Sequence, residues 1–261
     1  MRPGAGRAVL TAVAAAVLVY LFVPIALIVV FSFNRPTGRY NLVWQRFTLD
    51  NWLHPLADPA INDALGRSLQ VAAAATAAAA VMGTMVAIAL ARYRFRGGAL
   101  VNLLLVLPLT TPEIVLGSSL ALLFINRGVT RGFWTIVIAH ALFCVSFVAI
   151  TVKARIRGFD WTLEDAAMDL GAGPWRTFSR VTFPLILPGV LAAALLSFSL
   201  SIDDFIITAF VRGEGNTTFP TYVYGSFQRE LSPQVHVVST GLLVLSVAAL
   251  GLSVLYQRRR T

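Results

Sequence analysis

The sequence predicts an all-α integral membrane protein with six transmembrane helices and with both termini in the cytoplasm. Of its 261 residues, 57% are hydrophobic and 13% are charged, whereas about 25% of the residues in a soluble domain are charged. Six continuous apolar runs have about the 20-residue length that a helix needs to cross a bilayer; they cover residues 8–33, 69–91, 99–125, 133–151, 185–211 and 235–256. Continuous runs favour helices over the alternating strands of a membrane barrel.

The distribution of basic residues sets the predicted orientation. Thirteen of the 21 lysines and arginines lie at the two ends of the chain and in the second and fourth connections: Arg2, Arg7, Arg92, Arg94, Arg96, Lys153, Arg155, Arg157, Arg176, Arg180, Arg258, Arg259 and Arg260. The positive-inside rule therefore places both termini in the cytoplasm. This distribution also explains the net charge of +9 without a nucleic-acid partner. The basic tail, residues 257–261, is expected to meet anionic lipid headgroups.

The first apolar run has some features of a signal peptide, because two arginines precede it. It is longer than a signal peptide and lacks a clean small-residue cleavage site. Residues 1–34 are therefore predicted to be the first transmembrane helix with a short cytoplasmic N-terminus. Residues 35–64 form the predicted extracytoplasmic loop, in which Phe47, Trp52 and Leu53 belong either to a short interfacial helix or to an irregular segment.

The second run is rich in small side chains. Residues 72–80 are all alanine apart from Thr76, and Gly83 continues the small face. Small side chains let membrane helices pack closely, which replaces the hydrophobic drive that is absent in lipid. This run is therefore predicted to be a core helix of the bundle.

The fourth connection, residues 153–184, is inside and unusually rich in charge. Residues 163–170 carry an apolar stripe at helical spacing, formed by Leu163, Ala166, Ala167 and Leu170. Thr162 is predicted to cap this helix. Gly171 permits a left-handed stop, and Pro174 suits the first turn of a second short helix. This helix–glycine–helix elbow has a shape suited to docking a partner, and a plain interfacial loop is the alternative.

The elbow resembles the EAA loop of ABC importer permeases, in which E-A-A is followed after three residues by G and after nine more by I-x-L-P. Here the matching residues, at the same spacing, are Asp165, Ala166, Ala167, Gly171, Val181, Phe183 and Pro184. The departures are aspartate for glutamate at 165, valine for isoleucine at 181 and phenylalanine for leucine at 183. The wider resemblance covers nearly the whole chain. It implies the six-helix type I importer permease fold, with residues 65–256 as the transmembrane type-1 domain of five helices.

The resemblance also implies roles and partners. The loop is expected to be a coupling helix in a groove of an ATPase subunit, with contacts from Glu164, Asp165, Ala166, Ala167 and Gly171. The implied partners are a second permease of similar fold, two ATPase subunits and an extracytoplasmic solute-binding protein. ATP and magnesium would be bound by the ATPase, and no cofactor is expected in this chain. The protein is therefore expected in the bacterial inner membrane as a multi-pass transport subunit and not as an enzyme.

Two shorter stretches are similar to polyamine-importer permeases, residues 108–115 and residues 201–207. They contain three acids well inside apolar runs: Glu113, Asp203 and Asp204. An ionisable residue inside a membrane helix costs about 2.5–3.5 kcal/mol or more and is therefore a candidate functional residue. No lysine or arginine lies in the flanking apolar stretches, so a cationic solute is the predicted partner. The resemblance implies that this solute is a polyamine such as spermidine or putrescine. The alternative for each acid is a hydrogen-bonded carboxylate that only fixes packing. For Glu113 this alternative rests on Pro108 and Pro112, which are expected to break the helix and to free N–H groups that would hold the carboxylate.

Adjacent helical residues point about 100° apart. Asp203 and Asp204 therefore cannot both face one path unless the helix unwinds, and we expect one to face the path and the other to pack toward a neighbouring subunit. In the last outside loop, Tyr222 and Tyr224 offer ring faces to an amine. An aromatic belt at the membrane interface is the alternative for these tyrosines.

The sequence lacks the motifs of the common hydrolases. There is no phosphate-binding G-x-x-x-x-G-K-[ST] loop, no H-E-x-x-H zinc motif and no G-x-S-x-G elbow. Lys153 is the only lysine. Cys144 is the only cysteine and is expected to be a buried, inert thiol. His140 is expected to pack or to form hydrogen bonds. An ATPase must therefore be a separate chain.

Two other functions remain open. The same architecture could import another small solute of the iron, phosphonate or opine type. An ion-coupled secondary transporter that uses Asp203 and Asp204 as a proton relay belongs to another class, but it leaves the elbow unexplained.

Overall fold

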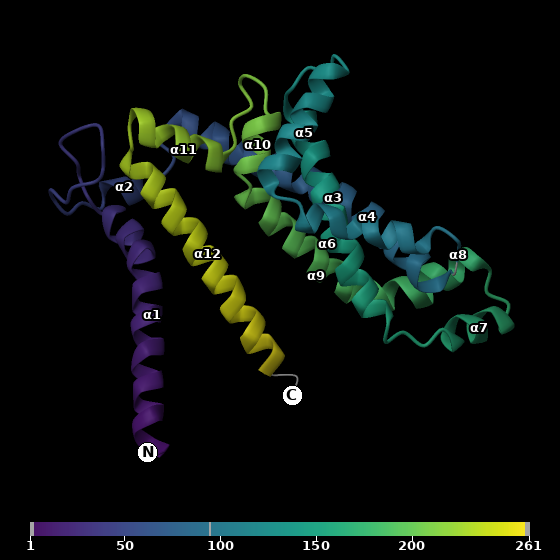
Figure 1. The fold of residues 1–261 in the computed structure, drawn as a ribbon. Coiled ribbons are helices and arrows are strands. Elements are labelled where there is room, and N and C mark those ends of the chain that lie inside the picture. The colour runs from purple at the N-terminus through teal and green to yellow at the C-terminus, as the bar shows by residue number, and fades with distance from the viewer. Residues whose placement is uncertain (1–2, 94, 259–261) are drawn as a thin grey trace. The chain divides into compact units, whose positions relative to one another are not determined.

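The structure, a computed structural model, describes residues 3–93 and 95–258, with side chains for residues 6–93 and 95–247. Every regular element in these ranges is a helix (Figure 1). The chain divides into two compact units: one contains the chain through Asn62 and from Tyr222 onward, and the other is Asp63–Thr221. The predicted orientation used Arg2, Arg94, Arg259 and Arg260, which lie outside the described residues.

The first unit contains two long helices, α1 (Pro3–Phe31) and α12 (Pro233–Arg258), which pack against each other. The loop after α1 is irregular, but its polar groups are paired. Asn34 and Asn41 are buried, and the Nδ2 group of Asn34 donates to Oδ1 of Asn41 at 2.7 Å. One helical turn, α2 (Asp50–Leu53), includes Trp52 and Leu53 and leaves Phe47 outside. The segment is therefore mostly irregular with a single helical turn.

The second unit is built around α6 (Phe133–Ile156), which packs against α4 (Gly98–Thr110), α9 (Phe183–Asp203) and α10 (Ile206–Val211). The long helix α3 (Pro59–Arg92) ends in this unit and begins before residue 69, inside the predicted loop. Its small face is buried as predicted: Ala72, Ala75, Ala79 and Ala87 are fully covered. A Cβ at Gly83 would lie 2.7 Å from Val148 of α6, so only glycine permits this close approach.

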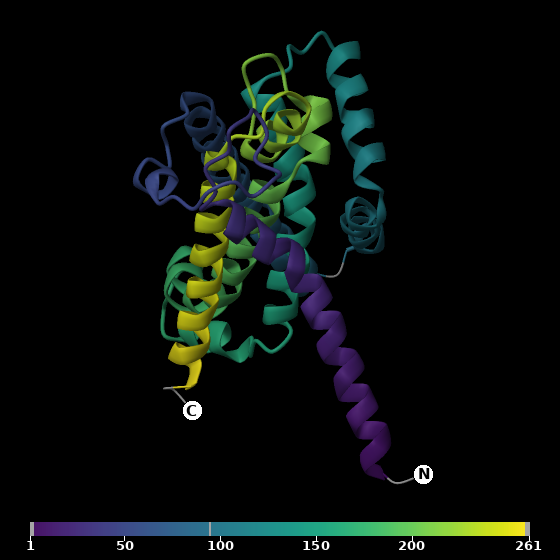
Figure 2. The same ribbon diagram turned by 90° about the vertical axis from the view of Figure 1, so that its left-hand side faces the viewer.

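The third apolar run, predicted as one span over residues 99–125 with a break at its prolines, is two helices. α4 ends at Thr110, α5 (Glu113–Asn126) begins at Glu113, and their axes differ by 108°. Figure 2 shows the bend, with α4 seen almost end-on next to the upright α5. Proline disfavours the helical region for the residue before it, and Thr111 before Pro112 is extended, with ψ of 130°. Pro112 therefore breaks this run, whereas Pro108 lies inside α4.

The fifth run, predicted as one helix over residues 185–211, is also broken. α9 ends at Asp203, Asp204 is extended with ψ of 123°, and α10 begins at Ile206. At its other end α9 starts earlier than predicted: α8 (Pro174–Thr177) and a π-helical turn, η1 (Phe178–Thr182), lead into it without interruption.

The described helices include four that are long and apolar enough to cross a membrane, or five if the bent pair is one span. In α12 the described apolar part, Pro233–Val247, is shorter than a span. The number of six spans and the cytoplasmic termini stay predictions.

Candidate functional site

The elbow has the predicted form of two short helices around a glycine. α7 (Thr162–Asp169) is followed by Gly171, whose φ of +84° lies in the left-handed region, and α8 begins at Pro174. The predicted cap was wrong, because Thr162 is already helical. Its backbone N–H and its hydroxyl both donate to Oδ1 of Asp160, at 3.0 and 2.8 Å. The hydroxyl bond is the main reason that the pKa of Asp160 is below its usual value.

Glu164 is buried at the base of the elbow and does not point outward. It is 3% exposed. Its Oε2 atom lies 2.6 Å from Nη1 of Arg92, the last residue of α3, and Thr182 donates its hydroxyl to Oε1. The guanidinium of Arg92 also lies 5.6 Å from the ring centre of Trp161. The expected contact of Glu164 with a partner does not fit this placement, since its carboxylate is used to hold the elbow against α3.

The outer surface of the elbow carries the other predicted coupling residues. Asp165 and Ala166 are exposed, Ala167 is half-buried, and Gly171 is exposed. Next to them Leu170 is 90% exposed, and Trp175, in α8, is 77% exposed. Large apolar side chains with so much free area, beside an acid and small residues, mark a surface on which another protein can dock.

The two adjacent aspartates have different surroundings. Asp203 ends α9 and is exposed. The Asp204 side chain is 8% exposed, and its carboxylate accepts hydrogen bonds from the backbone N–H of Thr208 at 2.8 Å and from the Thr208 hydroxyl at 2.7 Å. Nε2 of His140 lies 3.1 Å from the same carboxylate. Because the helix unwinds at Asp204, the two carboxylates separate: that of Asp203 is exposed and that of Asp204 caps α10. The expectation that one of them packs toward a neighbouring subunit was wrong for Asp204, because its carboxylate is bonded within its own chain.

His140 is at the centre of this buried polar cluster. Nδ1 of His140 lies 2.7 Å from the hydroxyl of Ser201, and Nε2 lies 2.9 Å from the hydroxyl of Thr208. The prediction that His140 forms hydrogen bonds is confirmed. Cys144, one turn further along α6, is buried as predicted.

Glu113 is exposed at the first position of α5. The helices that follow the two breaks are in contact, because α5 packs on α10. A Cβ at Gly117 would lie 3.0 Å from the ring of Phe210 and 3.2 Å from Cα of Ile207. The two stretches that contain the membrane acids therefore support each other through a close helix contact.

The tyrosines of the last outside segment lie in α11 (Phe219–Arg229). The Tyr222 hydroxyl donates to Oδ2 of Asp58 at 2.9 Å. Burial, and then the hydrogen bond with Asp58, raise the pKa of Tyr222. Tyr222 is thus held in the first unit, whereas Tyr224 is 55% exposed.

The structure adds residues that the sequence did not identify for the site. Arg92 was counted only for orientation, and Thr182 and Thr208 were not singled out. No signal in the sequence joins Arg92 to Glu164, because 71 positions separate them. Within residues 3–93 and 95–258 there is no group of three or more histidine, cysteine or acidic side chains suited to a metal ion.

Residues 79–261 match the family described as the inner membrane component of binding-protein-dependent transport systems. The spermidine/putrescine transport system permease protein PotC of Escherichia coli (strain K12) is 36% identical over 246 residues, which cover 94% of this chain and 92% of PotC. The putrescine transport system permease protein PotI of the same organism is 37% identical over 231 residues, which cover 86% of this chain and 82% of PotI.

A solved structure shares the fold. A chain from the crystal structure of a bacterial ABC transporter involved in the import of the acidic polysaccharide alginate aligns with a TM-score of 0.70. The alignment covers 97% of this chain and 98% of that chain, at 17% sequence identity. The helix arrangement is thus that of an ABC transporter permease.

Proposed function

This chain belongs to the family of inner membrane components of binding-protein-dependent transport systems, and we propose that it forms half of the translocation path of an ATP-driven polyamine importer. Membership places it in the bacterial inner membrane as a multi-pass transport subunit, not an enzyme, that works with an ATPase and a solute-binding protein. The proposed cargo is spermidine or putrescine. The observation that carries this proposal is the similarity to two polyamine permeases over most of the chain.

We propose that a second permease of similar fold completes the path and that two ATPase subunits bind ATP and magnesium. The elbow supports this arrangement, because its free outer surface combines Asp165, Ala166 and Leu170. Movement of a docked ATPase would push the elbow. The elbow is joined to α3 by the pair of Glu164 and Arg92 and continues without a break into α9. The push would therefore reach two helices of the bundle and alternate access to the path.

We propose that Asp203 meets the amine and that Asp204 holds the unwound turn in place. Asp203 is exposed next to a break in the helix, and irregular backbone at membrane depth is tolerated where it lines a cavity. Glu113 has the same setting after the other break. Tyr224 and, less directly, Tyr222 would offer aromatic faces to the amine outside the membrane.

The test is uptake into proteoliposomes that contain this chain with its neighbouring gene products. ATP-dependent uptake of labelled spermidine or putrescine is the expected result. Excess unlabelled iron chelate, phosphonate and opine should leave that uptake unchanged. If one of them competes, that compound and not a polyamine would be the cargo. Uptake that follows a proton gradient without ATP would refute the importer and favour a secondary transporter.

A further inference from the structure

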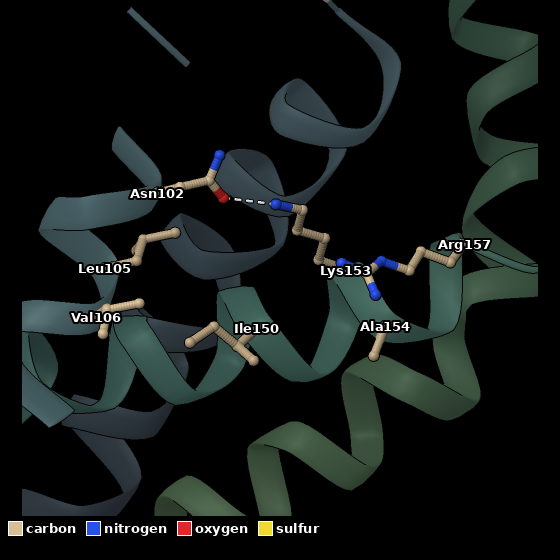
Figure 3. Close-up of a pocket in the computed structure, with 7 residues that line it drawn as sticks. All are labelled: Asn102, Leu105, Val106, Ile150, Lys153, Ala154 and Arg157. Atoms are coloured by element: carbon tan, nitrogen blue, oxygen red, sulfur yellow. Dashed lines mark hydrogen bonds between the residues drawn. The ribbon is translucent and has the colours of Figure 1, made fainter. Parts of the chain in front are cut away.

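A cavity lies between α4 and the C-terminal end of α6. Its volume is about 280 Å³, and it is lined by Asn102, Leu105, Val106, Ile150, Lys153, Ala154 and Arg157. Figure 3 shows Asn102, Leu105 and Val106 on α4 facing the side chains from the end of α6, with the amine of Lys153 directed at Asn102. The Nζ atom of Lys153 lies 2.5 Å from Oδ1 of Asn102, a bond that joins the start of α4 to the end of α6. The coupling surface and the proposed solute path do not use this cavity.

The cavity holds two positive charges that the described chain does not neutralise. Lys153 is half-buried, and its partner Asn102 is a neutral amide. Arg157 directly follows the end of α6 and is exposed, and its side chain extends toward Lys153 (Figure 3). In the described part of the chain neither cation has an ion pair, and none of the seven lining residues is acidic. Two like charges without a counter-ion, of which Lys153 is half-buried, favour an anion between them.

The remaining walls of the cavity are apolar and open onto a lipid-like surface. Leu105, Val106 and Ile150 line it. Two of these lining side chains are also partly open to the outside, since Val106 is 43% exposed and Ile150 is 39% exposed. A soluble anion gains nothing from these apolar side chains, whereas a phospholipid presents a phosphate to the cations and an acyl chain to Val106 and Ile150.

The depth of the two polar anchors also suits a lipid headgroup. Lys153 lies three residues before the end of α6, and Asn102 lies four residues after the start of α4. At about 1.5 Å per residue, both are about 5–6 Å inside the ends of their helices, where the headgroups meet the hydrocarbon. Basic pockets between membrane helices on the cytoplasmic side bind the headgroups of anionic lipids.

We propose that the cavity between α4 and α6 is a site for an anionic phospholipid of the cytoplasmic leaflet, with its phosphate held by Lys153 and Arg157. The choice of leaflet rests on the orientation assumed for the proposed function. Lipid binding itself requires neither solute nor ATP, so it can be measured whether or not the polyamine assignment holds.

The test uses the full chain with its co-purified partners in nanodiscs of phosphatidylglycerol and phosphatidylcholine, analysed by native mass spectrometry after release from the disc. The native protein should retain phosphatidylglycerol in preference to phosphatidylcholine. Lys153→Gln with Arg157→Gln should lower that retention by about tenfold or more, since each cation near the surface contributes to attraction of anionic lipid. The matched control, Arg155→Gln with Arg176→Gln, removes the same charge on the same side and should stay within about twofold.

Further arms separate the alternatives. Lys153→Arg keeps the charge and should retain the lipid, which distinguishes charge recognition from a folding defect. Inorganic phosphate at millimolar concentration should not displace the lipid; if it does, the site binds free phosphate instead. Equal retention of the two lipids, or equal retention by the double variant and its control, would overturn the proposal. So would lipid bound to the chain alone but absent from the complex, because the second permease would then cover the cavity.

Discussion

The guanidinium of Arg92, the last residue of α3, lies 2.6 Å from the carboxylate of Glu164 in α7. The Glu164 side chain is 3% exposed and that of Arg92 is 38% exposed, so the pair is sheltered on one side only. The Thr182 hydroxyl donates to the other carboxylate oxygen, which ties the same residue to η1. The end of α3 and the turn η1 thus both bind one carboxylate of α7. This convergence gives the elbow a fixed base from which a partner can move the membrane helices.

Arg92→Met should loosen this base. Removal of one partner of a fully buried pair costs about 3–5 kcal/mol, and about 2–3 kcal/mol is expected here because Arg92 is partly exposed. Thermal unfolding of the purified complex should show the loss, together with a lower ratio of solute uptake to ATP hydrolysis. Arg96→Met serves as the control, since Arg96 is exposed in the same turn and has no ion pair among the described residues.

The same pair also predicts a rescue. Arg92→Met combined with Glu164→Leu removes both charges, and an apolar pair of similar size often replaces a buried ion pair without loss. The double variant should therefore be more stable than either single variant. If the stability loss of the double variant equals the sum of the losses of the two single variants, the pair is not the unit that holds the elbow.

Gly171→Ala should strain the elbow, whereas Gly173→Ala should not. Both glycines have open space around the position of a Cβ, but only Gly171 has a positive φ, at +84°. A left-handed conformation costs a residue with a Cβ about 1–2 kcal/mol. Gly171→Ala should lower coupled uptake at an unchanged level of membrane insertion. Similar uptake for the two variants would show that the left-handed turn is not needed.

Leu170→Asp tests the docking surface without disturbing the fold. Leu170 is 90% exposed, and surface substitutions usually change stability by less than about 0.5 kcal/mol. The melting temperature of the chain should stay the same, while co-purification with the ATPase falls by about tenfold or more, because a charge would be buried in the contact. Arg180→Gln, a change at an exposed residue of η1, provides the comparison. An ATPase that binds Leu170→Asp normally would contradict the placement of the interface.

Asp203→Asn and Asp204→Asn should separate transport from stability. Asp203 is exposed, so Asp203→Asn should raise the polyamine concentration needed for half-maximal uptake and should leave the unfolding temperature unchanged. Asp204 caps α10 and is bonded to Thr208 and His140. Asp204→Asn should therefore cost about 1–3 kcal/mol of stability. Uptake assays and thermal unfolding on both variants check the division, and equal stability losses would reject it.

Local patterns in the sequence were sufficient for the elbow. The stripe of residues 163–170, Gly171 and Pro174 predict a helix, a left-handed stop and a second helix, and each is present. These features depend on the preferences of neighbouring residues, which is why they can be read from the chain itself. The prolines of the third run indicate its break, whereas the break at Asp204 was missed as a helix end, because hydropathy averages over a window and does not register a single extended residue.

The sequence by itself determined that the chain is a helical membrane protein, that its alanine-rich helix lies in the core, and that an elbow connects two membrane helices. It did so because membrane length, residue size and backbone preference act over short stretches of chain. Only the tertiary structure decided which acids are free. Glu164 and Asp165 are neighbours, as are Asp203 and Asp204, yet in each pair one carboxylate is bonded inside and the other is exposed. That choice is made by Arg92 and His140, distant in sequence, whose approach depends on how the helices pack.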